Sequence, residues 1–180
     1  MQQYSKEIAD GLMRAKWIES IRLRGVTSIG TGISQILYNL AFSPWIRNID
    51  ISSIAVGTNA ECCEGVYKLI KISGSLEYLN LNYTGIYDGL AKDFFTALGE
   101  NKSLKALLID SNSRFYNQLN EFGKSIAFNQ KKNGSLEVLS AVGGIDNGQG
   151  NIFLRGMFIS EFEHEQWYGD KQVAQKMKGE

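Results

Sequence analysis

The chain repeats one pattern of apolar positions five times. Two apolar residues one helical turn apart are followed by a polar turn and then by three apolar residues with strand-like spacing, most clearly in ALGENKSLKALLIDSN at 97–112. We call the first of these three residues the anchor. The anchors are separated by 28, 30, 28 and 32 residues, a period typical of a solenoid that gains one helix and one strand per repeat. They are Ile18, Ile46, Leu76, Leu104 and Leu136.

The pattern predicts a helix before each anchor and a strand that begins near it. The first helix is expected over 5–16 with Ser5 as its N-cap, and the third over about 60–72. The fifth repeat contains a polar insertion, NQKKNG at 129–134, which we expect to bulge from the rim without disturbing the core. The helical pairs expected to face inward are Ile8 and Leu12, Ile36 and Leu40, Val66 and Ile70, Phe94 and Leu98, and Phe122 and Ile126.

A single repeat buries too little apolar surface to offset the entropy lost on ordering it, so the repeats must stack. The predicted fold is an α/β, right-handed solenoid shaped as a horseshoe, with a parallel sheet on its concave face and helices on its convex face. Residues 1–144 form this array of about five repeats. Residues 145–180 are expected to form a hairpin strand and a helix, which serve either as a cap or as a docking arm.

These residues resemble the leucine-rich repeat family, in its ribonuclease-inhibitor-like class with long, helix-containing repeats, over roughly 5–144. The stretch 97–112 is similar to that class's consensus ALxxNxSLxxLxLxxN, and SLEYLNLN at 75–82 also fits. The family's asparagine eight residues after the anchor is present only as Asn112. The resemblance implies a horseshoe that holds a protein partner in its concavity.

Strand alternation directs anchor positions +2, +4 and +6 into the concavity. Polarity falls along this face, from charged and amide side chains in the first three repeats to small and apolar ones in the last two. We expect the apolar end to be covered, either by the protein's own C-terminal segment or by a partner protein. The candidate partner-binding residues are Arg22, Arg24, Asn48, Asp50, Tyr78, Asn80, Asn82, Leu108 and Asp110.

Two tryptophans, Trp17 and Trp45, stand one residue before their anchors, where the later repeats have serine. Neighbouring repeats should bring the two indoles close together on one rim, where they are a candidate binding hot spot. The alternative, which we favour, is that both rings pack over helix ends and the loop at Pro44.

Composition limits the class of partner. The 180 residues include 19 basic and 19 acidic side chains, so zero net charge argues against nucleic acid as a partner. No stretch approaches the roughly 18 apolar residues that a membrane span needs. Cys62 and Cys63 lack metal-ligand spacing and are interpreted as small core residues in a reducing compartment. We expect an intracellular, cytoplasmic protein, with an organelle or a cytoskeletal assembly as open alternatives.

No pattern of catalytic, cofactor-binding or metal-binding residues is recognisable. The single histidine, His164, has no nucleophile motif beside it, and the glycine-rich loop at 143–150 lacks the phosphate-binding pattern GxxxxGK[ST]. We therefore predict a noncatalytic protein-protein interaction module or structural subunit, with no cofactor. Two alternatives stay open: a regulator of a small GTPase, similar to the GTPase-activating protein of Ran with the same repeat class, and an RNA-binding solenoid.

Overall fold

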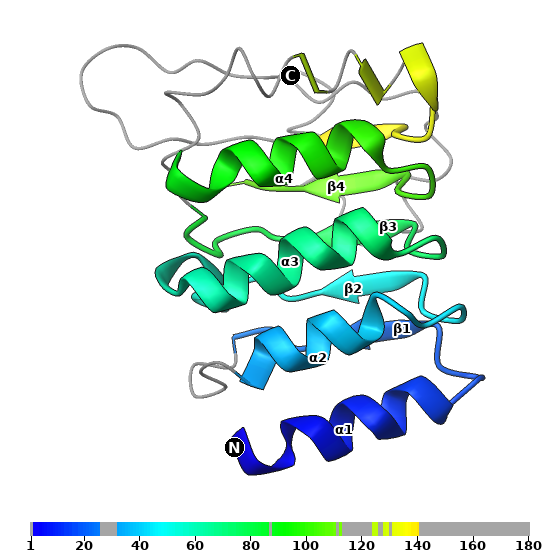
Figure 1. Cartoon of the computed structure of the whole chain (residues 1–180), viewed down its shortest axis with the longest axis vertical. Coiled ribbons are helices and arrows are strands. Elements are labelled where there is room, and N and C mark those ends of the chain that lie inside the picture. The colour runs from blue at the N-terminus through cyan, green and yellow to red at the C-terminus, as the bar shows by residue number, and fades with distance from the viewer. Residues whose placement is uncertain are drawn as a thin grey trace, which may run out of the picture.

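The structure is a computed structural model that describes residues 2–25, 32–86, 88–110, 112, 124–125, 128–129 and 131–140. Helices and short strands alternate along the sequence (Figure 1). The helices are α1 (Gln2–Arg14), α2 (Gly32–Leu40), α3 (Ala60–Ile72) and α4 (Asp88–Glu100), with a 3₁₀ turn, η1 (Val56–Thr58). The strands are β1 (Ser20–Arg22), β2 (Asn48–Asp50), β3 (Tyr78–Asn80), β4 (Ala106–Leu108) and β5 (Val138–Ser140).

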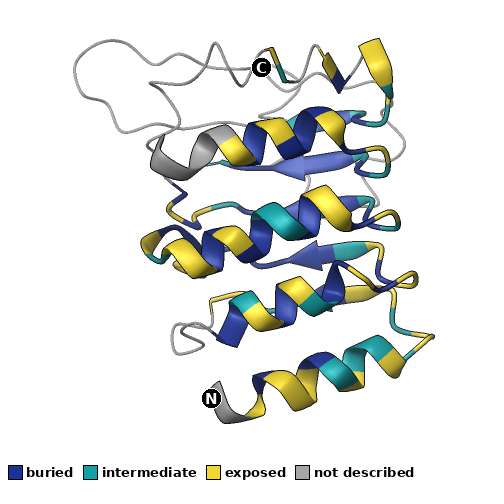
Figure 2. Ribbon diagram, viewed as in Figure 1, coloured by how far each residue is buried: buried dark blue, intermediate teal, exposed yellow. Residues whose placement is uncertain are grey.

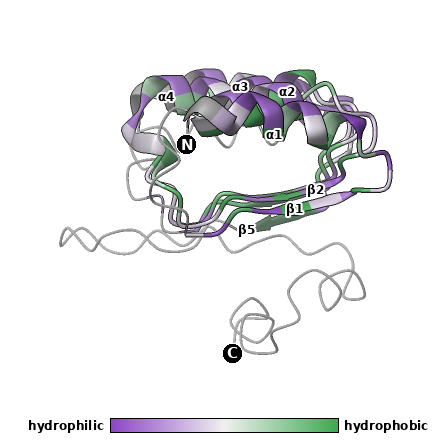
Figure 3. Cartoon of the chain, turned by 90° about the horizontal axis from the view of Figure 1, so that it is seen from below, coloured by the Kyte–Doolittle hydropathy of each residue, from purple (hydrophilic) through white to green (hydrophobic). Residues whose placement is uncertain are grey.

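The strands form one five-stranded parallel sheet in the order β1-β2-β3-β4-β5. Their middle residues are register partners, so the predicted phase of the repeat is confirmed. Helices α1 to α4 all lie on one side of the sheet (Figure 3). The fold is therefore mixed α/β, with one helix and one strand from each of the first four repeats and strand β5 from the fifth. The paired middle residues are Ile21, Ile49, Leu79, Leu107 and Leu139.

The main core fills the space between the helices and the sheet (Figure 2). Ile49 and Leu79 are fully buried there, as alternation predicts. The first helix differs from the prediction, because Ile8 is 49% exposed whereas Ser5 and Ala9 are buried. Helix α1 also begins at Gln2, so Ser5 lies inside it and is no N-cap. Among the described helices α1 packs only against α2, so just the narrow stripe that faces this neighbour and the sheet is buried.

In the third, fourth and fifth repeats, a polar side chain in the helix-to-strand turn accepts a hydrogen bond from the anchor N–H at the start of the strand. The anchor N–H of Leu76 donates to Ser73 Oγ at 3.1 Å, and that of Leu104 donates to Asn101 Oδ1 at 2.6 Å. In the fifth repeat Asn129 takes this role, and it also donates to the carbonyls of Leu98 and Asn101 at 2.9 and 2.8 Å. The insertion is thus not confined to the rim, because its first residue is buried and holds the preceding turn.

Asn112 ties the third and fourth repeats together. Its amide donates to the carbonyls of Leu81 and Ile109, at 2.8 and 3.0 Å. Its oxygen accepts from Thr84 Oγ1 at 3.0 Å and from the N–H of Ile86 at 3.1 Å. One buried side chain therefore satisfies several backbone groups of two turns, which explains why this position favours asparagine.

Some of the sequence-based predictions fall outside the described residues. These are the separation of residues 145–180 as a hairpin and helix, the loop at 143–150, His164, and the inward pair Phe122 and Ile126. Within the described ranges, no helix is both long enough and apolar enough to cross a membrane.

Candidate functional site

We call the side of the sheet opposite the helices the strand face. It is formed by the first and third residues of each strand, because the middle residues point into the main core. Parallel register aligns these side chains in two columns across the sheet. One column contains Ser20, Asn48, Tyr78, Ala106 and Val138, and the other contains Arg22, Asp50, Asn80, Leu108 and Ser140.

The part of the strand face on β3, β4 and β5 contains a buried apolar cluster. Tyr78, Ala106, Leu108 and Val138 form a second hydrophobic cluster, separate from the main core. Leu108 has no exposed surface and Tyr78 is 7% exposed. The apolar end is covered, as predicted. Leu108 therefore offers no surface for binding.

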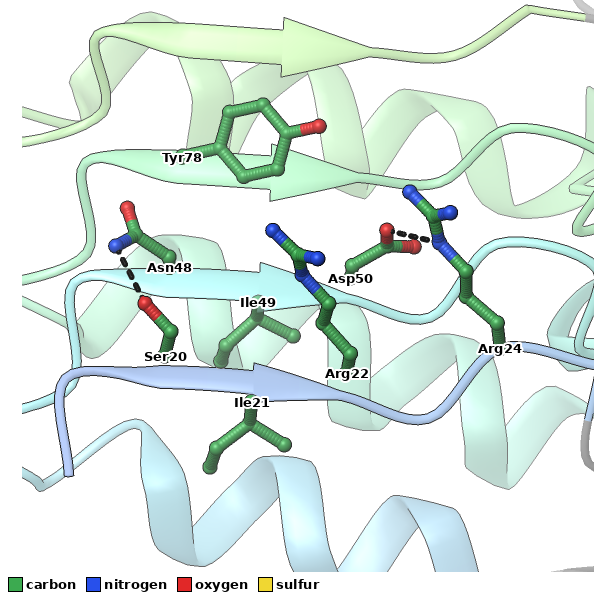
Figure 4. Close-up of a pocket in the computed structure, with 8 residues that line it drawn as sticks. All are labelled: Ser20, Ile21, Arg22, Arg24, Asn48, Ile49, Asp50 and Tyr78. Carbon is green, nitrogen blue, oxygen red and sulfur yellow. Dashed lines mark hydrogen bonds and ion pairs between the residues drawn. The ribbon is translucent and has the colours of Figure 1, made fainter. Parts of the chain in front are cut away.

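The part of the strand face on β1 and β2 is polar and open. A pocket of about 360 Å³ lies there, with Tyr78 at its β3 side (Figure 4). It brings together five of the predicted partner-binding residues from three repeats. The pocket is lined by Ser20, Ile21, Arg22, Arg24, Asn48, Ile49, Asp50 and Tyr78.

Asp50 is the only acidic side chain among the described residues that line the pocket, and both of its oxygens have partners. Oδ2 accepts from Arg24 Nε at 2.5 Å, and Oδ1 accepts from the N–H of Ser52 at 3.0 Å. The carboxylate is buried, whereas the Arg24 side chain is mostly exposed. A buried carboxylate needs such compensation, so this pair fixes the wall of the pocket.

Arg22 is the second cation of the pocket. It is the register partner of Asp50, yet the carboxylate pairs with Arg24 instead. Arg22 is exposed and makes no ion pair with any described residue. Its guanidinium extends over β2 between Asn48 and Asp50 (Figure 4). The two arginines and one aspartate leave the pocket with one formal positive charge, carried by a side chain that is available to bind.

Three neutral side chains, Tyr78, Asn48 and Ser20, complete the polar lining. Burial, and then the nearby Asp50 carboxylate, raise the pKa of the Tyr78 phenol to about 12, so its hydroxyl stays protonated at neutral pH. Asn48 Nδ2 donates to Ser20 Oγ at 2.8 Å. The other amide atom, Asn48 Oδ1, is buried without a hydrogen-bond partner among the described residues. One acceptor in the described part of the pocket, on the strand next to Arg22, therefore has no hydrogen-bond donor.

The remaining predicted site residues are not part of this pocket. Asn80 is buried, and its Oδ1 accepts from the N–H of Asn82 at 3.0 Å. Asn82 and Asp110 are joined by two hydrogen bonds, of 3.2 and 2.7 Å. The two bonds between Asn82 and Asp110 hold the ends of β3 and β4 together. The position of all three side chains on the strand face was predicted, but Asn80 is not the open contact that we expected, because the apolar cluster adjoins it.

The two rim tryptophans do not behave as a packed pair. Trp17 is 82% exposed, so the favoured interpretation, that its ring packs over a helix end, is wrong. Trp45 is partly exposed, with the Lys16 ammonium 5.9 Å from its ring centroid. The ring contacts in the described part of the protein join other aromatic residues. Serine at this position bonds to the preceding repeat, as Ser75 Oγ does to the Ser43 carbonyl at 2.6 Å.

Ser20, at anchor position +2, was predicted to face the concavity but was not named among the candidate binding residues, and it lines the pocket. Sequence reasoning missed one feature near the site. Glu77 forms ion pairs with Arg47 and Lys105, which stand at anchor position +1 of the adjacent repeats. The alternation of basic and acidic residues at this position of the repeat could have predicted these ion pairs. Arg47, Glu77 and Lys105 form a row that stabilises the starts of neighbouring strands beside the pocket. All three of its charges are paired.

The cysteines are core residues, as predicted. Both are buried without a disulfide. Burial, and then the neighbouring Cys62, raise the pKa of the Cys63 thiol to about 11, which makes it a poor nucleophile at neutral pH. In the described ranges, no group of three or more histidine, cysteine, aspartate or glutamate residues is placed to hold a metal ion.

No protein-family model matches the sequence, and no curated protein is detectably similar to it. A similar solved structure is the tropomodulin C-terminal domain from Caenorhabditis elegans, which has a leucine-rich-repeat-like fold. The two superpose with a TM-score of 0.63 at 16% identity, over 97% of the present protein and 98% of that one. This likeness shows the fold at the level of leucine-rich-repeat-like architecture.

Proposed function

We propose that this protein is a noncatalytic protein-interaction module or structural subunit, built as a right-handed leucine-rich repeat solenoid of the ribonuclease-inhibitor-like class. It binds a protein partner through the β1–β2 end of the strand face. The observation that carries this proposal is the division of that face. Exposed charged side chains surround a pocket at one end, while the other end is buried in the isolated protein.

The chemistry of the pocket supports binding rather than catalysis. Its carboxylate is paired on both oxygens, and its phenol stays protonated at neutral pH. The carboxylate has both oxygens occupied, and the phenol is a poor general base at this pH. An arginine beside an aromatic ring is instead a combination enriched where proteins bind each other.

Affinity purification with quantitative mass spectrometry tests the proposed surface. The wild type, Arg22→Glu and Arg14→Glu are tagged and expressed in cells of the source organism. Arg14→Glu is the matched control, since it makes the same charge change on the exposed end of α1. We expect Arg22→Glu to lose partners that the wild type and the control retain. Loss from the control alone would place binding on the helices and contradict the proposal.

A GTPase turnover assay tests the noncatalytic part of the proposal. Purified protein is added to a Ran-type GTPase, and the release of phosphate is followed. We expect no acceleration at any protein concentration. Stimulation that depends on the added protein would favour the regulatory alternative instead.

A further inference from the structure

The pocket contains a cation without a counterion among the described residues. Asp50 would be the natural partner of Arg22, because the two residues are register partners on β1 and β2. Its oxygens are instead used by Arg24 Nε and by the N–H of Ser52. Arg22 therefore directs its guanidinium donors over the pocket, with no acceptor from any described residue (Figure 4).

The shape of this cation selects a type of anion. A guanidinium presents parallel N–H groups in a planar fork, which matches the two oxygens of a carboxylate. The floor below it is the backbone of β1 and β2 at Ile21 and Ile49, whose side chains point into the main core, and the Tyr78 ring flanks the β3 side. Contact of the ligand with the Tyr78 ring would exclude water and strengthen the charge-assisted hydrogen bonds.

Asn48 sets a second requirement for the ligand, which is a hydrogen-bond donor. Its buried Oδ1 lacks a donor among the described residues, and it lies on the strand next to Arg22. A peptide carries backbone N–H groups close to its carboxylates, so it can satisfy both the guanidinium and the amide.

We propose, building on the function above, that this pocket binds a carboxylate of a partner polypeptide, with Arg22 as its main contact. The carboxylate belongs either to an acidic side group or to the free C-terminus of the partner. The chemistry of recognition is the same for the two sources, and the test separates them.

Nuclear magnetic resonance titration of the full-length protein, labelled with ¹⁵N, provides this test. Four probes are compared at equal concentration: acetyl-Gly-Glu-Gly-amide, acetyl-Gly-Gln-Gly-amide, acetyl-Gly-Gly-Gly with a free carboxylate, and inorganic phosphate. We expect the amides of residues 20–24 and 48–50 to shift with one or both carboxylate peptides and not with the glutamine peptide. The stronger of the two identifies the source. Equal shifts with glutamine or phosphate, or no shifts, would overturn the proposal.

Arg22→Gln should weaken binding of the carboxylate peptide by at least about tenfold, the loss typical of removing a charge-assisted hydrogen bond. Arg14→Gln is the matched control and should bind as the wild type does. The spectra themselves show whether each variant is folded. Unchanged affinity in Arg22→Gln would contradict the assignment of the cation.

A steric variant separates this inference from the proposed function. Ser20→Trp places a large ring at the pocket without changing charge. Loss of cellular partners from both Ser20→Trp and Arg22→Gln supports both claims. Loss of partners from Ser20→Trp alone would support the proposed binding surface and overturn the proposal that it binds a carboxylate. Retention by both variants overturns the proposed function itself.

Discussion

The two ends of the strand face share one backbone arrangement and differ in what covers their side chains. Arg22 and Leu108 occupy the same column of the parallel register, three strands apart. The first is exposed at a pocket and the second has no exposed surface. A repeat backbone therefore does not determine which positions are available for binding. The side chain and its local cover determine this, so stability and binding should respond differently at the two ends.

The largest effects should be equal at both ends, because the inward layer does not differ between them. Ile49→Asp and Leu79→Asp each bury an unpaired charge in the main core. We expect each to cost more than about 4 kcal/mol of unfolding free energy, enough to unfold the protein. Chemical denaturation followed by circular dichroism measures this. A mild effect at either position would show that the inward assignment is wrong.

On the strand face the two ends should separate. Leu108→Ala should cost about 2–5 kcal/mol, since it leaves a cavity in the second hydrophobic cluster. Arg22→Ala should change stability by no more than about 0.5 kcal/mol, because this exposed side chain has no described ionic partner. Urea denaturation of both variants gives the comparison. Similar costs at the two positions would refute the division of the face.

The link between the third and fourth repeats should have an intermediate effect. Asn112→Ala removes hydrogen bonds to the turns after β3 and β4, and it leaves buried backbone groups unpaired. We expect a loss of about 1–3 kcal/mol. Asn39→Ala, which removes a hydrogen bond between exposed side chains on helix α2, is the control and should be close to neutral. Equal losses of stability in the two variants would show that Asn112 does not link the two repeats.

The smallest effect should be confined to high pH. Burial raises the pKa of Tyr78 to about 12, so the folded state favours the protonated phenol. The stability that this contributes is fully present below about pH 10, the ordinary pKa, and is lost as pH rises towards 12. Tyr78→Phe should flatten that decline, measured as melting temperature between about pH 9 and 12. Tyr83→Phe, which removes an exposed hydroxyl, is the control, and the same flattening there would contradict the assignment.

Periodicity was sufficient to predict the inward layer. Ile49, Leu79 and Leu107 follow from alternation around the anchors, and the parallel register aligns them. The same reasoning failed at Ile8, because a helical stripe is buried only where a neighbouring helix covers it. At Asn129 it failed because a polar residue is buried readily when backbone carbonyls satisfy it. Such compensation depends on tertiary position rather than on residue type.

Strand alternation predicted which face of the sheet carries the candidate site, but it did not predict the contacts between the side chains there. Alternation placed Arg22, Arg24 and Asp50 on the same surface. It could not decide which arginine pairs with the aspartate, since register alone favours Arg22 whereas the structure pairs Arg24. It also could not show that Leu108 is buried there, because the order of polar and apolar rows does not reveal what covers them.

Site-specific photo-crosslinking tests the central claim most directly. The photoreactive residue p-benzoylphenylalanine is introduced at Ser20 on the strand face and, in a second variant, at the exposed Phe42 in the turn that follows α2. Both variants are irradiated in cells of the source organism, and covalent adducts are identified by mass spectrometry. Our account predicts a specific protein adduct from position 20 and none of that protein from position 42. The same partner captured at position 42 and absent at position 20 would contradict it.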